Sequence, residues 1–282
     1  MSRHGFELKT NDQIILMREA GLATAAALKA VRAAIKPGVS TLELDKIADD
    51  TINSLGGHSN FQLVPGYSHT ICASINDEVV HGIPAANRIL QAGDIVSIDC
   101  GAEIGEWNGD SAITVVVPGG DPEIHGLREH LSRTTETSLW VGIAVLATAE
   151  HLNEVGAAIE AYIQDEAEES GRKFGILEEY VGHGIGRSMH EDPPVFNYAV
   201  REKGPKVVPG LCVAIERKNQ DFGRWLDSFY QGWRRRQPLG AHRGGARGWN
   251  LGSDRARRGS RKACPLRHYP GATGLNRVKS NI

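Results

Sequence analysis

Apolar residues recur at helical spacing near the start of the chain. Between residues 11 and 36 they line one face of a helix, which Pro37-Gly38 ends. A second helix is predicted from Ser40 to about Leu55, because Ser40 and Glu43 form the Ser-x-x-Glu pattern of a capping box. The face of the first helix contains Ile14, Met17, Ala20, Leu28, Val31 and Ile35.

Shorter apolar runs follow, with the length and composition of strands. Strands are predicted at 70–75, 95–98 and 112–117, helices at 122–146 and 149–170, and further strands at about 176–181 and 211–215. Two helices followed by strands therefore occur twice in the chain. This order predicts an α+β fold, with a pseudo-twofold sheet covered by helices.

No helical or strand period continues past Glu216. The last segment, 217–282, contains ten glycines and arginine runs at 234–236 and 257–258, but no Glu. We predict one domain over residues 1–216 and an irregular or disordered basic tail over 217–282.

The charge of the chain is distributed unevenly, and it adds a functional hint only for the tail. The chain has 282 residues, of which 40% are hydrophobic, and a net charge of −2, which excludes a wholly disordered protein. The net charge combines −15 over residues 1–216 with +13 over residues 217–282. Such a basic segment is typical of nucleic-acid binding, and it also fits a segment of different origin.

Membrane and secretory signals are not found in the sequence. No apolar run reaches the roughly 20 residues of a membrane helix, and the N-terminus lacks the apolar stretch of a signal peptide. We therefore expect a cytoplasmic protein that binds no membrane. No C-x-x-C pair occurs among the four cysteines, Cys72, Cys100, Cys212 and Cys264, which argues against a thiolate zinc site. We expect Cys100 and Cys212 to be buried in strands.

Two aspartates are the first candidates for chemistry. Asp99 follows the apolar run 95–98, and Asp110 opens the next strand eleven residues later. A hairpin would bring the two carboxylates together at one end of a sheet. Carboxylates that close repel unless a cation or a shared proton lies between them. Either residue alone could equally be a turn or strand-end aspartate.

Histidines and one glutamate likewise lie at the end or edge of strand-like segments. His81 precedes Gly-Ile-Pro at an expected strand end, and His183 lies among glycines that let ligands or another backbone segment approach. His190 follows seven residues after His183, and Glu216 ends the apolar run 210–215. Each alone could be incidental. Together with the aspartates they form an oxygen and nitrogen donor set that suits Mn, Fe, Co or Zn, as in two-metal hydrolases.

These segments resemble type I methionine aminopeptidases, the metallopeptidases with the pita-bread fold. The resemblance runs from about Thr10 to Glu216. It is carried by Asn-Asp-Glu-Val-Val-His-Gly-Ile-Pro at 76–84, Ser-Ile-Asp-Cys-Gly at 97–101, Asn-Gly-Asp-Ser-Ala at 108–112, Gly-His-Gly-Ile-Gly at 182–186 and Ala-Ile-Glu at 214–216. It implies a pita-bread fold with a pseudo-twofold antiparallel sheet, truncated here after about residue 216.

The resemblance also implies roles for particular residues. Asp99, Asp110, His183 and Glu216 would be metal ligands, with Asp110 bridging two divalent ions per subunit (Co, Mn, Fe or Zn). His81 and His190 would be catalytic and face the substrate, His81 on the leaving side of the scissile amide and His190 on its carbonyl oxygen. The pocket for the methionine side chain would be lined by Tyr67, Cys72 and Met189.

A family of this kind implies a substrate and partners. The substrate would be the N-terminus of a nascent polypeptide, met at the ribosome, in which a small residue follows methionine. A tight pocket for that second residue would select it sterically. We expect a monomer that binds no DNA.

The chain departs from the family after Glu216. The family continues with Pro and later supplies a second bridging Glu in a Trp-Glu-His-Thr or Phe-Glu-His-Thr segment, whereas here Arg217 follows and no later Glu occurs. We therefore expect impaired activity. One alternative is a non-catalytic binding module of the same fold, with the basic tail contacting RNA or the ribosome. Another is a prolidase-like peptidase, although Val-Val-His-Gly-Ile-Pro favours methionine specificity.

A reading-frame shift would explain the tail. When residues 237–243 are read one base forward, their codons permit Ser-Arg-Trp-Glu-His-Thr-Val, which is the missing family segment. We expect the nucleotide sequence to encode Glu after Trp in that frame. Any other codon at this position would overturn the hypothesis.

Overall fold

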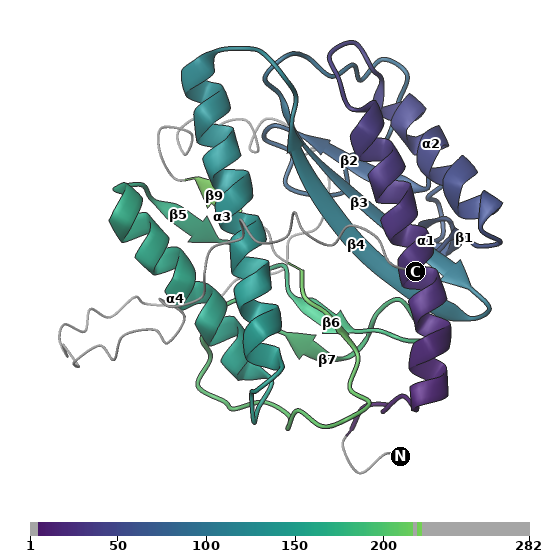
Figure 1. The fold of residues 1–282 in the computed structure, drawn as a ribbon, viewed down its shortest axis with the longest axis vertical. Helices are drawn as coiled ribbons and strands as arrows, with labels where there is room; N and C mark the ends of the chain where they lie inside the picture. The colour runs from purple at the N-terminus through teal and green to yellow at the C-terminus, as the bar shows by residue number, and fades with distance from the viewer. Residues whose placement is uncertain (1–4, 217–218, 222–282) are drawn as a thin grey trace, which may run out of the picture. The chain divides into compact units, whose positions relative to one another are not determined.

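The structure is a computed structural model that describes residues 5–216 and 219–221 (Figure 1). All of these residues belong to one compact unit, Met1–Gly232. Among them, no helix is long and apolar enough to cross a membrane. The basic tail predicted over 217–282 lies outside the described residues, except for a short strand at Asn219–Asp221. That strand differs from the irregular structure predicted for this segment.

Two helices begin the fold as predicted. Helix α1 spans Asn11–Ala34 and helix α2 spans Thr41–Ser54. The predicted capping box of α2 is confirmed, since the Ser40 hydroxyl accepts from the Glu43 amide and the Glu43 carboxylate accepts from the Ser40 amide. The buried face of α1 starts only at Ala20. Ile14, predicted on that face, is 38% exposed and lies before it.

The first half forms a four-stranded antiparallel sheet, with α1 and α2 packed together over it (Figure 1). The edges of β3 have different partners: β1 and β2 pair with successive stretches of one edge, and β4 pairs with the other. The strands are β1 His58–Ser59, β2 Ile71–Ile75, β3 Ile95–Ile104 and β4 Trp107–Val116, with a short 3-10 helix, η1, at Phe61–Leu63.

Strands β3 and β4 are longer than predicted. Every second residue of β3 from Val96 to Ala102 is fully buried in the core beneath α1 and α2. This alternation continues past the apolar run 95–98, so the strand continues although Asp99 and Glu103 are charged. Replacing the fully buried Ile98 by Ala would cost about 2–5 kcal/mol of folding free energy.

The second half repeats the order of two helices followed by strands, as predicted. It has its own core around Val155, Ile159 and Val195. Two small antiparallel sheets follow, one with the strand order β5-β9 and one with the order β7-β6-β8. The elements are α3 Pro122–Leu146, α4 Asn153–Ser170, β5 Phe174–Ile176, β6 Gly182–Gly184, β7 Glu191–Val195, β8 Val213–Ala214 and β9 Asn219–Asp221.

The predicted strand at 176–181 is wrong. β5 ends at Ile176, and residues 177–181 form a turn and irregular backbone that lead into β6. The strand predicted at 211–215 is limited to Val213–Ala214. His183 was predicted at a strand edge, whereas it is the central residue of β6. Glycine has low strand propensity, so β6 produces no strand signal in the sequence.

Close packing of β4 on α1 requires a glycine. A Cβ atom on Gly109 would lie 2.6 Å from the Gly21 nitrogen and 2.7 Å from the Ala20 carbonyl, both backbone atoms of α1. Gly109 therefore sets the separation between the helix and the strand that carries Asp110.

We predict that Gly109→Ala lowers the free energy of unfolding by about 1–3 kcal/mol, because the added methyl group pushes α1 off the sheet. The matched control is Gly21→Ala, where the new methyl group meets open space. It should stabilise α1 by up to about 1 kcal/mol. Urea unfolding measures both changes, and equal midpoints for the two variants would contradict the packing argument.

Candidate metal centre

The register of the β3–β4 hairpin places two carboxylates on one face of the sheet. Asp99 lies opposite Ala112, and Asp110 lies opposite Gly101, so the two aspartates are diagonal neighbours. The predicted hairpin is therefore confirmed, but its predicted location at a strand end is wrong. Both residues lie inside long strands, on the face opposite the one that α1 and α2 cover.

His183 and Glu216 reach Asp110 from the second half. β6 pairs with β8 so that His183 lies opposite Ala214, two residues before Glu216. The Nε2 atom of His183 is 3.4 Å from Asp110 Oδ2 and 3.2 Å from Glu216 Oε1. Its Nδ1 lies 2.8 Å from the Gly184 carbonyl oxygen, to which it donates. This bond holds the ring so that Nε2 faces the carboxylates, as in metal-binding histidines.

The strand that carries His183 can exist only with glycine beside it. A Cβ atom on Gly184 would lie 2.1 Å from the Asp192 carbonyl oxygen of the neighbouring strand β7. The glycines around His183 thus allow another part of the backbone to approach, as predicted from the sequence.

The charges around His183 attract a positive ion. Burial of His183 disfavours its charged form, but hydrogen bonds to Asp110 and Glu216 outweigh burial and raise the pKa of His183 to about 10. The side chain of Asp110 is only 6% exposed, so its charge requires a partner. A divalent cation bound between these carboxylates would supply the positive charge that the proton on His183 otherwise supplies.

The donor atoms fit a divalent ion. One ligand atom each from Asp110, His183 and Glu216 lies within 4.8 Å of the others. Two carboxylates and an imidazole are ligands that suit Mn, Fe, Co or Zn. Asp99, the fourth predicted ligand, is not part of this group of three. It lies on the same face of the hairpin, opposite Cys72 of β2.

Two of the three predicted pocket residues lie beside Asp99. The Tyr67 hydroxyl donates to the Ile71 carbonyl oxygen at 2.6 Å and is 3.3 Å from the Cys72 sulfur. Burial raises the pKa of Tyr67, and the neighbouring Cys72 and the charge of Asp99 add to this effect. The phenol therefore stays neutral. Met189, the third pocket residue, is half-buried on the loop that leads to His190.

The two predicted substrate histidines differ in placement. His190 is exposed, and its ring centroid lies 4.3 Å from that of His183. It therefore lies next to the three candidate metal ligands. His81 is also exposed, but it is not at a strand end as predicted. β2 ends at Ile75, and His81 lies in the returning loop with a φ of 57°. The next residue, Gly82, accepts from the Ala73 amide at 2.8 Å, which runs this loop alongside β2.

Lys9 and Asn108 contact the His190 loop but were not predicted as site residues. The ammonium of Lys9 pairs with Glu191, directly after His190. The Asn108 side chain donates to the carbonyl oxygens of Gly186 at 3.2 Å and Arg187 at 3.0 Å. No periodic signal marks Lys9 in the sequence, since its partner lies far along the chain. Asn108 belongs to the Asn-Gly-Asp motif, which offered a signal.

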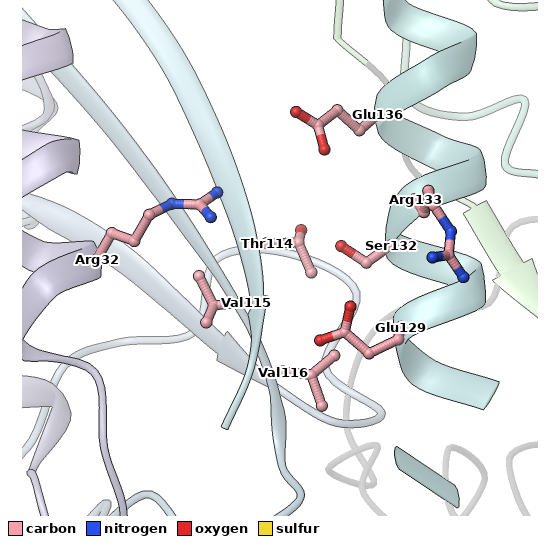
Figure 2. Close-up of a pocket in the computed structure, with 8 residues that line it drawn as sticks. All are labelled: Arg32, Thr114, Val115, Val116, Glu129, Ser132, Arg133 and Glu136. Carbon is pink, nitrogen blue, oxygen red and sulfur yellow. The ribbon is translucent and has the colours of Figure 1, made fainter. Parts of the chain in front are cut away.

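A separate cleft of about 220 Å³ lies between β4 and α3 (Figure 2). Arg32 reaches it from α1, and Glu129 and Glu136 reach it from α3. No candidate metal or substrate residue lines this cleft. We do not associate it with the metal centre.

The other cysteines do not contribute to the site. Cys100 is fully buried in β3, as predicted, and burial raises the pKa of its thiol. Cys212 is half-buried and lies just before β8, so its predicted burial in a strand is not borne out. Cys264 lies outside the described residues.

Curated relatives of this chain are named methionine aminopeptidases. Methionine aminopeptidase 1 of Mycobacterium tuberculosis is 46% identical over 200 residues, covering 71% of this chain and 74% of that protein. Methionine aminopeptidase 1 of Bacillus subtilis is 38% identical over 225 residues, covering 80% of this chain and 86% of that protein.

A solved structure and a family model extend the comparison. The crystal structure of methionine aminopeptidase from Rickettsia prowazekii aligns with a TM-score of 0.68 and 29% identity, covering 75% of this chain and 81% of that one. The predicted pita-bread fold is thereby confirmed. The family model for metallopeptidase family M24 matches residues 15–249, which extends past Glu216. The chain belongs to metallopeptidase family M24.

Proposed function

We propose that the chain removes the N-terminal methionine from polypeptides in a metal-dependent reaction. The observation that carries this proposal is the convergence of Asp110, His183 and Glu216 from separate strands onto one point. The names of the relatives, methionine aminopeptidases, support the substrate. Neither of the two curated relatives described above is named a prolidase.

The proposed cofactor is a pair of divalent ions, Mn, Co, Fe or Zn. Asp110, His183 and Glu216 would hold one ion, and Asp99 on the same face would serve the second, with Asp110 bridging. When bound, such ions polarise the scissile carbonyl and activate water for attack. The protein contributes the charge and the ligand orientation, through the Nδ1–H bond of His183 to Gly184.

The substrate groups would lie over the exposed side of this centre. His190, beside His183, would donate a hydrogen bond to the substrate carbonyl, and His81 would act on the leaving amide. Tyr67, Cys72 and Met189 would enclose the methionine side chain. We further propose that the substrates are nascent polypeptides with a small second residue, met in the cytoplasm, and that the enzyme acts as a monomer.

Activity should be low because one expected ligand is missing. The resemblance implies a second bridging Glu after Glu216, and the chain has none. A carboxylate in that place would also move the proton during hydrolysis. The alternative role as an RNA-binding module rests on the tail, almost all of which lies outside the described residues, and gains no support.

We predict that Asp110→Asn and His183→Ala each weaken Mn²⁺ binding at least about tenfold, since each removes a ligand or its charge. Isothermal titration calorimetry of the metal-depleted protein measures this. His190→Ala is the matched control, because His190 touches His183 but is not a proposed ligand. Wild-type affinity in His183→Ala would place the metal elsewhere.

We also predict slow, metal-dependent release of methionine from Met-Ala-Ser with Mn²⁺ or Co²⁺ added. Turnover should be at least about 100-fold below the roughly 10 s⁻¹ typical of enzymes, and a chelator should abolish it. Met-Trp-Ser serves as the control substrate and should not be cleaved. Typical turnover would contradict the impairment, and complete inactivity towards Met-Ala-Ser under all metals would contradict the proposed reaction.

A further inference from the structure

The loop between β6 and β7 carries Met189 and His190 and is held by the N-terminal half of the chain. The side chain of Asn108, two residues before Asp110, donates to the carbonyl oxygens of Gly186 and Arg187 at the start of the loop. The Asn108 amide also donates to Gly186 at 3.0 Å. The start of the loop is therefore tied to the strand that carries a metal ligand.

Lys9 holds the other end of the loop. Its side chain is only 2% exposed, and its ammonium pairs with the Glu191 carboxylate, which is 16% exposed. The backbone of Lys9 is itself anchored, since its amide donates to the Gly210 carbonyl oxygen at 2.7 Å. The other oxygen of Glu191 accepts from the Ser188 amide at 3.0 Å. Glu191 thus connects Lys9 to both sides of Met189 and His190.

The stability of the fold does not by itself require a buried ammonium at this position. Burying an ammonium and a carboxylate removes both from water, and a well-packed apolar pair of similar size is often as stable. A charged pair differs from an apolar pair in being directional. It specifies where Glu191, and with it the preceding residue, must lie.

We propose that Lys9 is a positioning residue that acts through Glu191 to hold His190 against His183 at the metal centre. Its ammonium fixes the Glu191 carboxylate, that carboxylate fixes the Ser188 amide, and His190, which lies between them in the chain, is held with its ring beside His183. The catalytic consequence rests on the proposed function, because His190 would touch the substrate carbonyl only in that reaction. The positional consequence does not depend on it.

Four variants test this proposal. Lys9→Met removes the charge but leaves Glu191 partly buried without its partner, so it is expected to lower the melting temperature. The double variant Lys9→Met with Glu191→Leu replaces the ion pair by apolar side chains and should keep the wild-type melting temperature. Lys9→Arg keeps the charge. Glu7→Gln is the matched control, since the Glu7 carboxylate lies 4.0 Å from the Lys9 ammonium but is 51% exposed.

The first measurement is NMR of the histidine Hε1 protons, with the His190 signal assigned from His190→Gln. The neighbouring ring of His183 should shift this signal and give a contact between the two rings. We expect both signatures to be lost in Lys9→Met and in the double variant, partly restored in Lys9→Arg and unchanged in Glu7→Gln. A stable double variant with the wild-type His190 signal would overturn the proposal.

The second measurement is the kinetics of methionine release from Met-Ala-Ser with Mn²⁺. In Lys9→Met and in the double variant, the displacement of His190 should lower kcat by about 10–100-fold with little change in KM. The reason is that the hydrogen bond from His190 to the substrate carbonyl strengthens in the transition state. A rise in KM alone would contradict the positioning role. If the wild-type chain releases no methionine while the NMR signatures follow the expected pattern, the proposed function fails and the positioning of His190 by Lys9 stands.

Discussion

The alternation of side chains along the β3–β4 hairpin is the constraint on which the rest of the structure depends. Successive residues point to opposite faces, so the residues between Val96 and Ala102 that pack under α1 and α2 leave Asp99 on the other face. The antiparallel register then places Asp110 on that same face. If either strand slipped by one residue, the carboxylate of that strand would be turned into the apolar core. The same alternation therefore places the apolar core on one face of the hairpin and the two candidate metal ligands on the other.

Positive charge from elsewhere makes this arrangement of carboxylates tolerable. Asp110 and Glu216 would repel each other at this separation, and His183 lies between them with its pKa raised to about 10. Lys9 plays a comparable part for Glu191 at the edge of the site. In both places a residue from one half of the chain neutralises a carboxylate from the other. The halves are therefore joined by electrostatic contacts at the site.

Most of the fold could be predicted from the sequence, because helices have strong local signals. The capping box at Ser40, the helical periods and the repeated order of elements are all present in the structure. Predictions failed where the local signal was ambiguous. The strand β3 appeared to stop at Asp99 because the apolar run ends there, although the alternation continues to Ala102. The glycine strand around His183 has no strand propensity and is recognised only from its pairing.

The sequence by itself named the candidate site residues. Asp99, Asp110, His183, His190 and Glu216 occur in motifs whose order resembles one family, and the comparisons confirm that family. Only the tertiary structure decided which of them meet. It brought Asp110, His183 and Glu216 to one point and placed Asp99 opposite Cys72. It also paired Lys9 with Glu191 next to the site. Contacts between residues so far apart in the chain depend on strand register and packing, which no local pattern encodes.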